Sequence, residues 1–145
     1  MSLRPAVPVV LALATVLAAC GSESAVRTAS PATAYVAAVQ AALDPAGRLA
    51  QIVAEAIDTP PAPWPDQEYV DGLVQSAEER LAELQTLRLD HDGLRRQRDR
   101  LVSALVPVVT RLQEAADRLR RRDRAALRSG AGPLFDALRR LPSAG

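Results

Sequence analysis

The amino-acid sequence predicts an all-α protein, a small helical bundle built on a long antiparallel helical hairpin. Apolar residues recur every three or four positions over much of the chain, and no segment shows the alternating pattern of a strand. Hydrophobic residues make up 48% of the 145 residues but aromatic residues only 3%, so Ala, Leu and Val must build the core. This length suits one modest domain.

The first helical region is expected to consist of two short helices. Ser30-Pro31 has the pattern of an N-cap followed by a proline in the first helical position, where a missing N–H costs nothing. Asp44-Pro45 repeats this pattern, so the sequence predicts a break there and a new helix after it. Two prolines at residues 60–61 are expected to end that second helix.

The third predicted helix forms one arm of the hairpin. It follows a stiff proline-rich connector over residues 59–65 and is expected to run from about Asp66 to about Leu89, with Gly93 in the turn. Its apolar residues step by four and three positions, which is the spacing of a heptad seam. They are Val70, Val74, Ala77, Leu81 and Leu84.

The fourth predicted helix is the longest and spans about Leu94–Arg128. A kink is expected at Pro107, because proline removes a backbone hydrogen bond and clashes with the preceding turn. Gly130 and Gly132 are expected to stop the helix, and a short final helix is expected over Pro133–Leu141. The seam of the long helix comprises Leu94, Leu101, Leu105, Val108, Leu112, Ala115 and Leu119.

The first twenty residues have the features of an export signal. Arg4 gives a short positive start, residues 7–17 are mostly apolar, and small residues precede Cys20. The sequence Leu17-Ala18-Ala19-Cys20 resembles the lipobox of bacterial lipoproteins at every position. The resemblance implies a signal peptidase that recognises Leu17, Ala18 and Ala19 and cleaves before Cys20. It also implies a diacylglyceryl group on the Cys20 sulfur, with fatty acyl chains such as palmitate.

This resemblance predicts three segments and a location. Residues 1–19 form the signal peptide, residues 20–30 the lipidated Cys20 and a small, polar, flexible tether, and residues 31–142 the bundle. The protein is then held on the extracytoplasmic face of the cell membrane, because two acyl chains give stable anchoring. The alternative is an ordinary secretory signal in which Cys20 stands by chance. Cys20 is the only cysteine, so the lipidated protein has no thiol for a disulfide or a metal site.

The charges of the chain are unevenly distributed. Residues 20–83 contain three Arg and ten acidic residues, whereas residues 84–145 contain fourteen Arg and seven acidic residues, and there is no Lys. One interpretation is that the two halves pack antiparallel and pair their charges. The other is a basic face directed at anionic lipid or wall polymer.

The densest basic run and the single Trp are the candidate surface-binding residues, namely Arg118, Arg120, Arg121, Arg122, Arg124 and Trp64. An envelope protein, an anionic lipid or a wall polymer is the expected partner, and export argues against nucleic acid. The alternative for the arginines is ordinary pairing along a helix surface, because several acidic residues stand four positions from an Arg. The alternative for Trp64 is packing over the end of the bundle.

The sequence offers no catalytic machinery, and we expect no enzyme, cofactor or metal. His91, the only histidine, lies in a predicted turn between Asp90 and Asp92, without the ligand spacing of a zinc site. Two function classes remain. One is a membrane-anchored interaction or scaffolding protein of the cell envelope. The other is a carrier that holds a lipid or another small apolar ligand inside the bundle.

Overall fold

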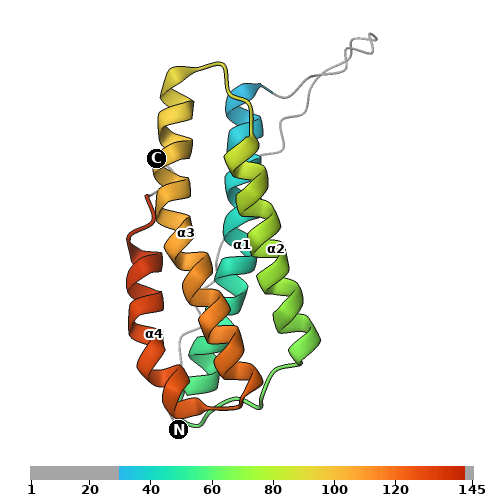
Figure 1. Ribbon diagram of the computed structural model, residues 1–145, viewed down its shortest axis with the longest axis vertical. Coiled ribbons are helices and arrows are strands. Elements are labelled where there is room, and N and C mark those ends of the chain that lie inside the picture. Colours follow the sequence, from blue (N-terminus) through green and yellow to red (C-terminus); the bar gives the residue numbers. More distant parts are fainter. Residues whose placement is uncertain (1–29, 143–145) are drawn as a thin grey trace, which may run out of the picture.

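The computed structural model describes residues 30–142, which form four α-helices: α1 Pro31–Ile57, α2 Gln67–Thr86, α3 Asp92–Arg120 and α4 Arg124–Arg139. Successive helices run in opposite directions along one long axis (Figure 1). No strand occurs within residues 30–142. The predicted all-α bundle is therefore confirmed.

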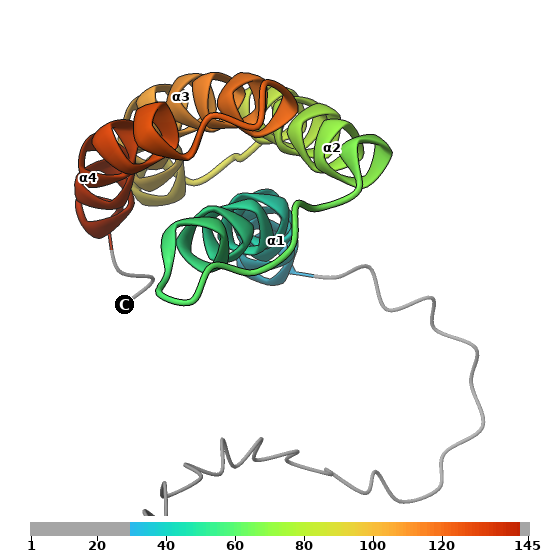
Figure 2. The ribbon, with the colours of Figure 1, turned by 90° about the horizontal axis from the view of Figure 1, so that it is seen from below.

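The four helices form a curved layer with one helix packed inside it. Seen along the bundle, α2, α3 and α4 follow an arc, and α1 lies on its concave side (Figure 2). α1 contacts all three other helices, whereas α2 and α4 contact only α1 and α3. α1 is thus the element around which the core is organised, and α2 and α4 form opposite edges of the layer.

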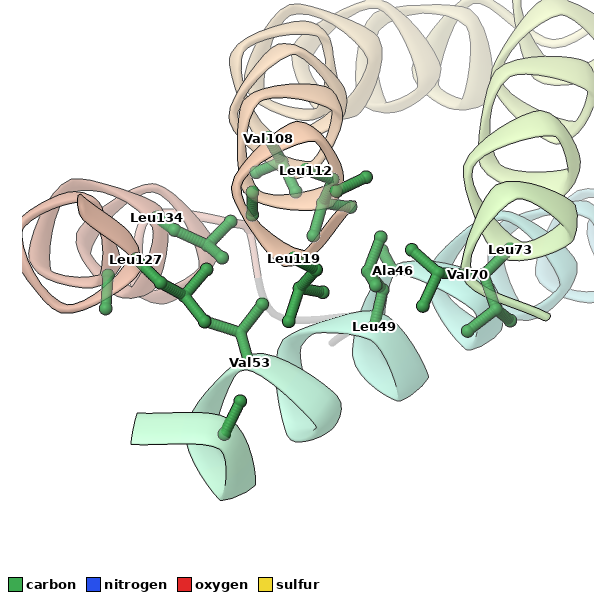
Figure 3. Close-up of a cluster of buried hydrophobic side chains, with 14 residues drawn as sticks. Ala46, Leu49, Val53, Val70, Leu73, Val108, Leu112, Leu119, Leu127 and Leu134 are labelled. Carbon is green, nitrogen blue, oxygen red and sulfur yellow. The ribbon is translucent and has the colours of Figure 1, made fainter. Parts of the chain in front are cut away.

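The larger hydrophobic cluster lies where all four helices are side by side. Leu49 and Val53 from α1, Val70 from α2, and Leu112 and Leu127 from α3 and α4 converge there, each at most 1% exposed (Figure 3). Side chains at helical spacing fill this space because each helix buries one stripe. The seams predicted for residues 70–84 and 101–119 supply much of it.

A second cluster fills the other half of the bundle, where α4 has ended. It contains Val39 and Ala42 of α1, Leu84 of α2, and Leu101 and Leu105 of α3. Only three helices form this half, because α4 has 16 residues and α3 has 29. The bundle therefore has a four-helix half and a three-helix half.

The predicted break at Asp44-Pro45 is wrong, since α1 continues through it. Pro45 is buried inside the helix, and the Asp44 carboxylate pairs with Arg48 one turn later at 2.9 Å. A proline inside a helix costs about 3 kcal/mol. Burial of apolar residues such as Ala46 and Leu49 on one continuous stripe offsets that cost.

The predicted boundary between the last two helices is also wrong. α3 ends at Arg120 rather than Arg128, and α4 then runs through Gly130, Gly132 and Pro133. Glycine costs only about 1 kcal/mol in a helix interior, so packing of the buried stripe on α4 overrides these local signals. α3 itself continues through Pro107, which is exposed.

Candidate functional site

The arginine run predicted as a binding surface lies at the turn between α3 and α4. This turn shares one end of the bundle with the proline-rich connector between α1 and α2 (Figure 1). We call this end of the bundle the connector end, and residues 58–66 and 121–123 form its loops. The opposite end holds Ser30 and residues 87–91, and we call it the loop end. The structure thus brings Trp64 together with the run, because Trp64 lies against Arg124 and lines a pocket with Arg120 and Arg122.

The turn itself depends on a left-handed arginine. Arg122 has φ 54°, its N–H donates to the Leu119 carbonyl at 3.0 Å, and the Asp123 N–H donates to the Arg118 carbonyl at 3.1 Å. This is the Schellman arrangement, in which glycine is the usual left-handed residue. Arginine there costs about 1–2 kcal/mol more than a right-handed conformation. Asp123 then caps α4 by accepting from the Ala126 N–H at 2.9 Å.

Arg124 joins α4 to the end of α1 and to the connector. Its guanidinium carbon lies 4.2 Å from the ring centroid of Trp64. Its Nε donates to the Ala56 carbonyl at 3.1 Å, and a terminal nitrogen donates to the Ala62 carbonyl at 3.0 Å. Trp64 is partly buried and packs against the larger cluster, so it has the packed position that the sequence left as an alternative.

A second arginine of α4 supports the same helix end. Arg128 donates to the Ile57 carbonyl at 3.3 Å. The last turn of α1 contains no basic residue of its own, and its free carbonyls carry partial negative charge. Arg124 and Arg128 therefore serve as the cap of α1, supplied by another helix.

Arg120 is engaged by acidic residues of two helices. It pairs with Asp71 of α2 at 2.7 Å and with Asp117 of α3 at 2.6 Å. The pKa of the Asp71 carboxyl is lowered, first by a hydrogen bond from the Gln67 amide and then by Arg120. These contacts join the second turn of α2 to the last turn of α3.

The remaining arginines of the run form fewer hydrogen bonds and ion pairs than Arg120 and Arg124. Arg118 is 3.9 Å from the Glu114 carboxylate and lies so close to Gly130 that a side chain there would overlap its guanidinium. Arg121 and Arg122 are exposed and have no ion pair within residues 30–142. Arg124 is therefore structural, Arg120 is neutralised, and Arg121 and Arg122 are available to solvent.

The interpretation in which the two halves pair their charges is wrong over most of the surface. In the part of the chain that the structure describes, the Arg120–Asp71 pair alone joins the acidic half to the basic half. The other ion pairs join residues at most four positions apart, such as Asp44 with Arg48 and Glu114 with Arg118. Such exposed pairs stabilise a fold by at most about 1 kcal/mol.

The charge of each bundle end differs from what the chain order suggests. At the connector end, residues 58–71 and 117–128 contain six Arg and six acidic residues. At the loop end, residues 30–43 contain no charged residue, residues 78–86 of α2 contain three Glu and one Arg, and residues 87–100 contain five Arg and three Asp. Both ends are therefore balanced in composition, and they differ in which arginines have ion pairs.

His91 is a helix cap. Its Nδ1 accepts from the Gly93 N–H at 3.1 Å at the start of α3, and Asp92 pairs with Arg95. The pKa of Asp92 is lowered, chiefly by its hydrogen bond from Arg95. No group of three metal-ligating side chains occurs within residues 30–142.

Two surface pockets are lined largely by charged and polar side chains. One of about 430 Å³ lies between α2 and α3, beside Asp71, Glu78 and Arg120. Another, of about 540 Å³, lies at the connector end beside Trp64 and Arg122. Charged linings suit polar groups rather than an apolar ligand.

The residues of the predicted lipidation signal, Leu17, Ala18, Ala19 and Cys20, lie outside the residues that the structure describes. Within residues 30–142, no helix has the length and apolar character needed to span a membrane. No protein-family model, curated protein or solved structure significantly matches this chain.

Proposed function

We propose that this chain is a lipoprotein of the bacterial cell envelope, held on the extracytoplasmic face of the membrane by lipid on Cys20. The observation that carries this proposal is the motif Leu17-Ala18-Ala19-Cys20, which ends a short apolar run directly at the cysteine. Two acyl chains on one cysteine are sufficient for stable anchoring.

The helical domain acts as an interaction or scaffolding module in this proposal. Its support is the charge of α2, which forms one edge of the layer and contains five acidic residues and one Arg. α4 forms the other edge, but Arg124 and Arg128 donate to carbonyls at the end of α1 and in the connector, and Arg139 pairs with an acidic residue of its own helix. α2 contacts only α1 and α3 among the described helices, and its Glu68 and Glu79 are exposed. The α2 edge can therefore meet a basic envelope component.

The carrier alternative has less support. An apolar ligand requires an apolar space, and the two pockets beside Arg120 are lined largely by charged and polar side chains. A third pocket, of about 500 Å³ beside Tyr69 and Leu73 of α2, is more apolar but is an open surface hollow. The bundle interior is filled by Leu, Val and Ala side chains from facing helices (Figure 3). A carrier would have to open one of these clusters to admit its ligand.

The Cys20→Ser variant tests the anchor. We expect the unaltered protein in the membrane fraction and the variant in the soluble extracytoplasmic fraction, because the serine hydroxyl cannot receive the thioether-linked lipid. The readout is an immunoblot of separated membrane and soluble fractions, and gel mobility reports cleavage. Ser22→Ala, two positions away, is the matched control and should remain in the membrane. Membrane retention of a cleaved Cys20→Ser chain would contradict the proposal.

A further inference from the structure

We infer that the loop end of the bundle binds the anionic head groups of the membrane that holds Cys20, through Arg88, Arg96 and Arg100. The inference rests on the proposed lipid anchor. It gives the bundle a defined orientation, with the loop end on the membrane and the connector end directed away from it.

The first support is the position of the loop end relative to the anchor. Ser30 caps the start of α1, and the connection between α2 and α3 lies at the same end of the bundle (Figure 1). Cys20 precedes Ser30 by ten residues, which span at most about 33–36 Å when fully extended. α1 has 27 residues and is about 40 Å long. The tether is therefore shorter than the bundle, and an inverted bundle cannot rest its connector end on this membrane.

The second support is the charge that faces the membrane in this orientation. The first 14 described residues, 30–43, contain no acidic residue to repel anionic lipid. The loop and the first turns of α3, residues 87–100, contain five Arg and three Asp, whereas the last turns of α2, residues 78–86, contain three Glu and one Arg. The positive charge of the loop end therefore lies on the side formed by the loop and α3.

The third support is that three of the five arginines in this segment form no ion pair within residues 30–142. Arg95 pairs with Asp92, and Arg98 pairs with Asp99 and donates to the Leu87 carbonyl at 2.6 Å. Arg98 thereby holds the loop against α3.

Arg88, Arg96 and Arg100 have no ion pair within residues 30–142, and all three are exposed. Each arginine close to an anionic surface strengthens the contact about fivefold, and this attraction fades over a Debye length of about 10 Å. Arg96 and Arg100 lie about 6 and 12 Å along α3 from its start.

The test measures which end of the anchored bundle lies near lipid. The full, lipidated protein is reconstituted into vesicles of phosphatidylcholine, with or without about 30% phosphatidylglycerol as the anionic lipid. A fluorophore is placed on Gln97→Cys at the loop end or on Ala125→Cys at the connector end, and nitroxide-bearing lipids quench it. Both positions are exposed, and Cys20 is blocked by its lipid, so the new thiol alone is labelled.

We expect quenching at position 97 to be about twofold or more stronger with phosphatidylglycerol than without it, and stronger than at position 125. The double variant Arg96→Gln/Arg100→Gln should reduce this gain to what Arg88 alone supplies, and about 1 M salt, where the Debye length is about 3 Å, should remove it. Arg121→Gln/Arg122→Gln removes the same charge from the connector end and should leave the gain unchanged.

Equal quenching in both vesicle types, stronger quenching at position 125, or equal effects of the two double variants would overturn the inference. Mass spectrometry of the same preparation reports the lipid on Cys20. A chain without that lipid counts against the proposed function, whereas a lipidated chain whose loop end stays away from the bilayer counts only against the orientation.

Discussion

Replacing Leu112 by alanine is expected to lower the free energy of unfolding by about 2–5 kcal/mol. Leu112 is fully buried and points from α3 into the cluster shared by all four helices (Figure 3). Truncation loses its transfer free energy and leaves a cavity, because helices packed on several sides cannot close the space. Urea unfolding followed by circular dichroism measures the change.

The matched control is Val106→Ala on the same helix, because Val106 is 44% exposed. Its effect should stay within about 0.5 kcal/mol, as for ordinary surface substitutions. If Leu112→Ala were as mild as this control, the assignment of Leu112 to the centre of the core would be incorrect.

Replacing Arg124 by alanine is expected to destabilise the protein by about 2–4 kcal/mol. The substitution removes the stacking on Trp64 and two hydrogen bonds to the Ala56 and Ala62 carbonyls. It leaves the end of α1 without much of its cap. Thermal unfolding reports the loss, and Trp64 fluorescence should shift to longer wavelength as the ring gains solvent.

Arg121→Ala is the comparison, because Arg121 is exposed three residues earlier and has no ion pair within the described chain. Its effect on stability should be within about 0.5 kcal/mol, with unchanged Trp64 emission. Similar losses in the two variants would mean that Arg124 acts only through its charge and not through its contacts with the connector.

The apolar spacing of the sequence predicted the packing faces well. The seam residues Val70, Ala77 and Leu84 of α2 are all buried, as are Leu101 to Leu119 of the α3 seam. This pattern is a reliable guide because each helix must turn one stripe toward its neighbours, whatever their exact arrangement.

Helix boundaries were harder to predict because they depend on the balance between local signals and burial. The Asp44-Pro45 pattern is a sound start signal, yet continuous burial along α1 overrides it. The turn at Arg122 was missed because a left-handed residue is normally glycine, and here it follows two other arginines. Asp123, which caps α4, was the residue in the sequence that could have indicated where this helix begins.

The candidate site shows the same limit. The run near Arg120 stands out along the chain, but the fold places it beside the acidic start of α2 and directs Arg124 into the structure. Arg96 and Arg100 are exposed and have no ion pair within residues 30–142, and only the structure makes this apparent. Charge density along a sequence does not give charge density in space, because distant segments contribute to each end.

The most direct test of the central claim is the mass of the N-terminal peptide from protein extracted from membranes with detergent. We expect a peptide that begins at Cys20 and carries the additional mass of a diacylglyceryl group on the sulfur. A peptide that begins at Cys20 without added lipid, or a chain that retains residues 1–19, would contradict it.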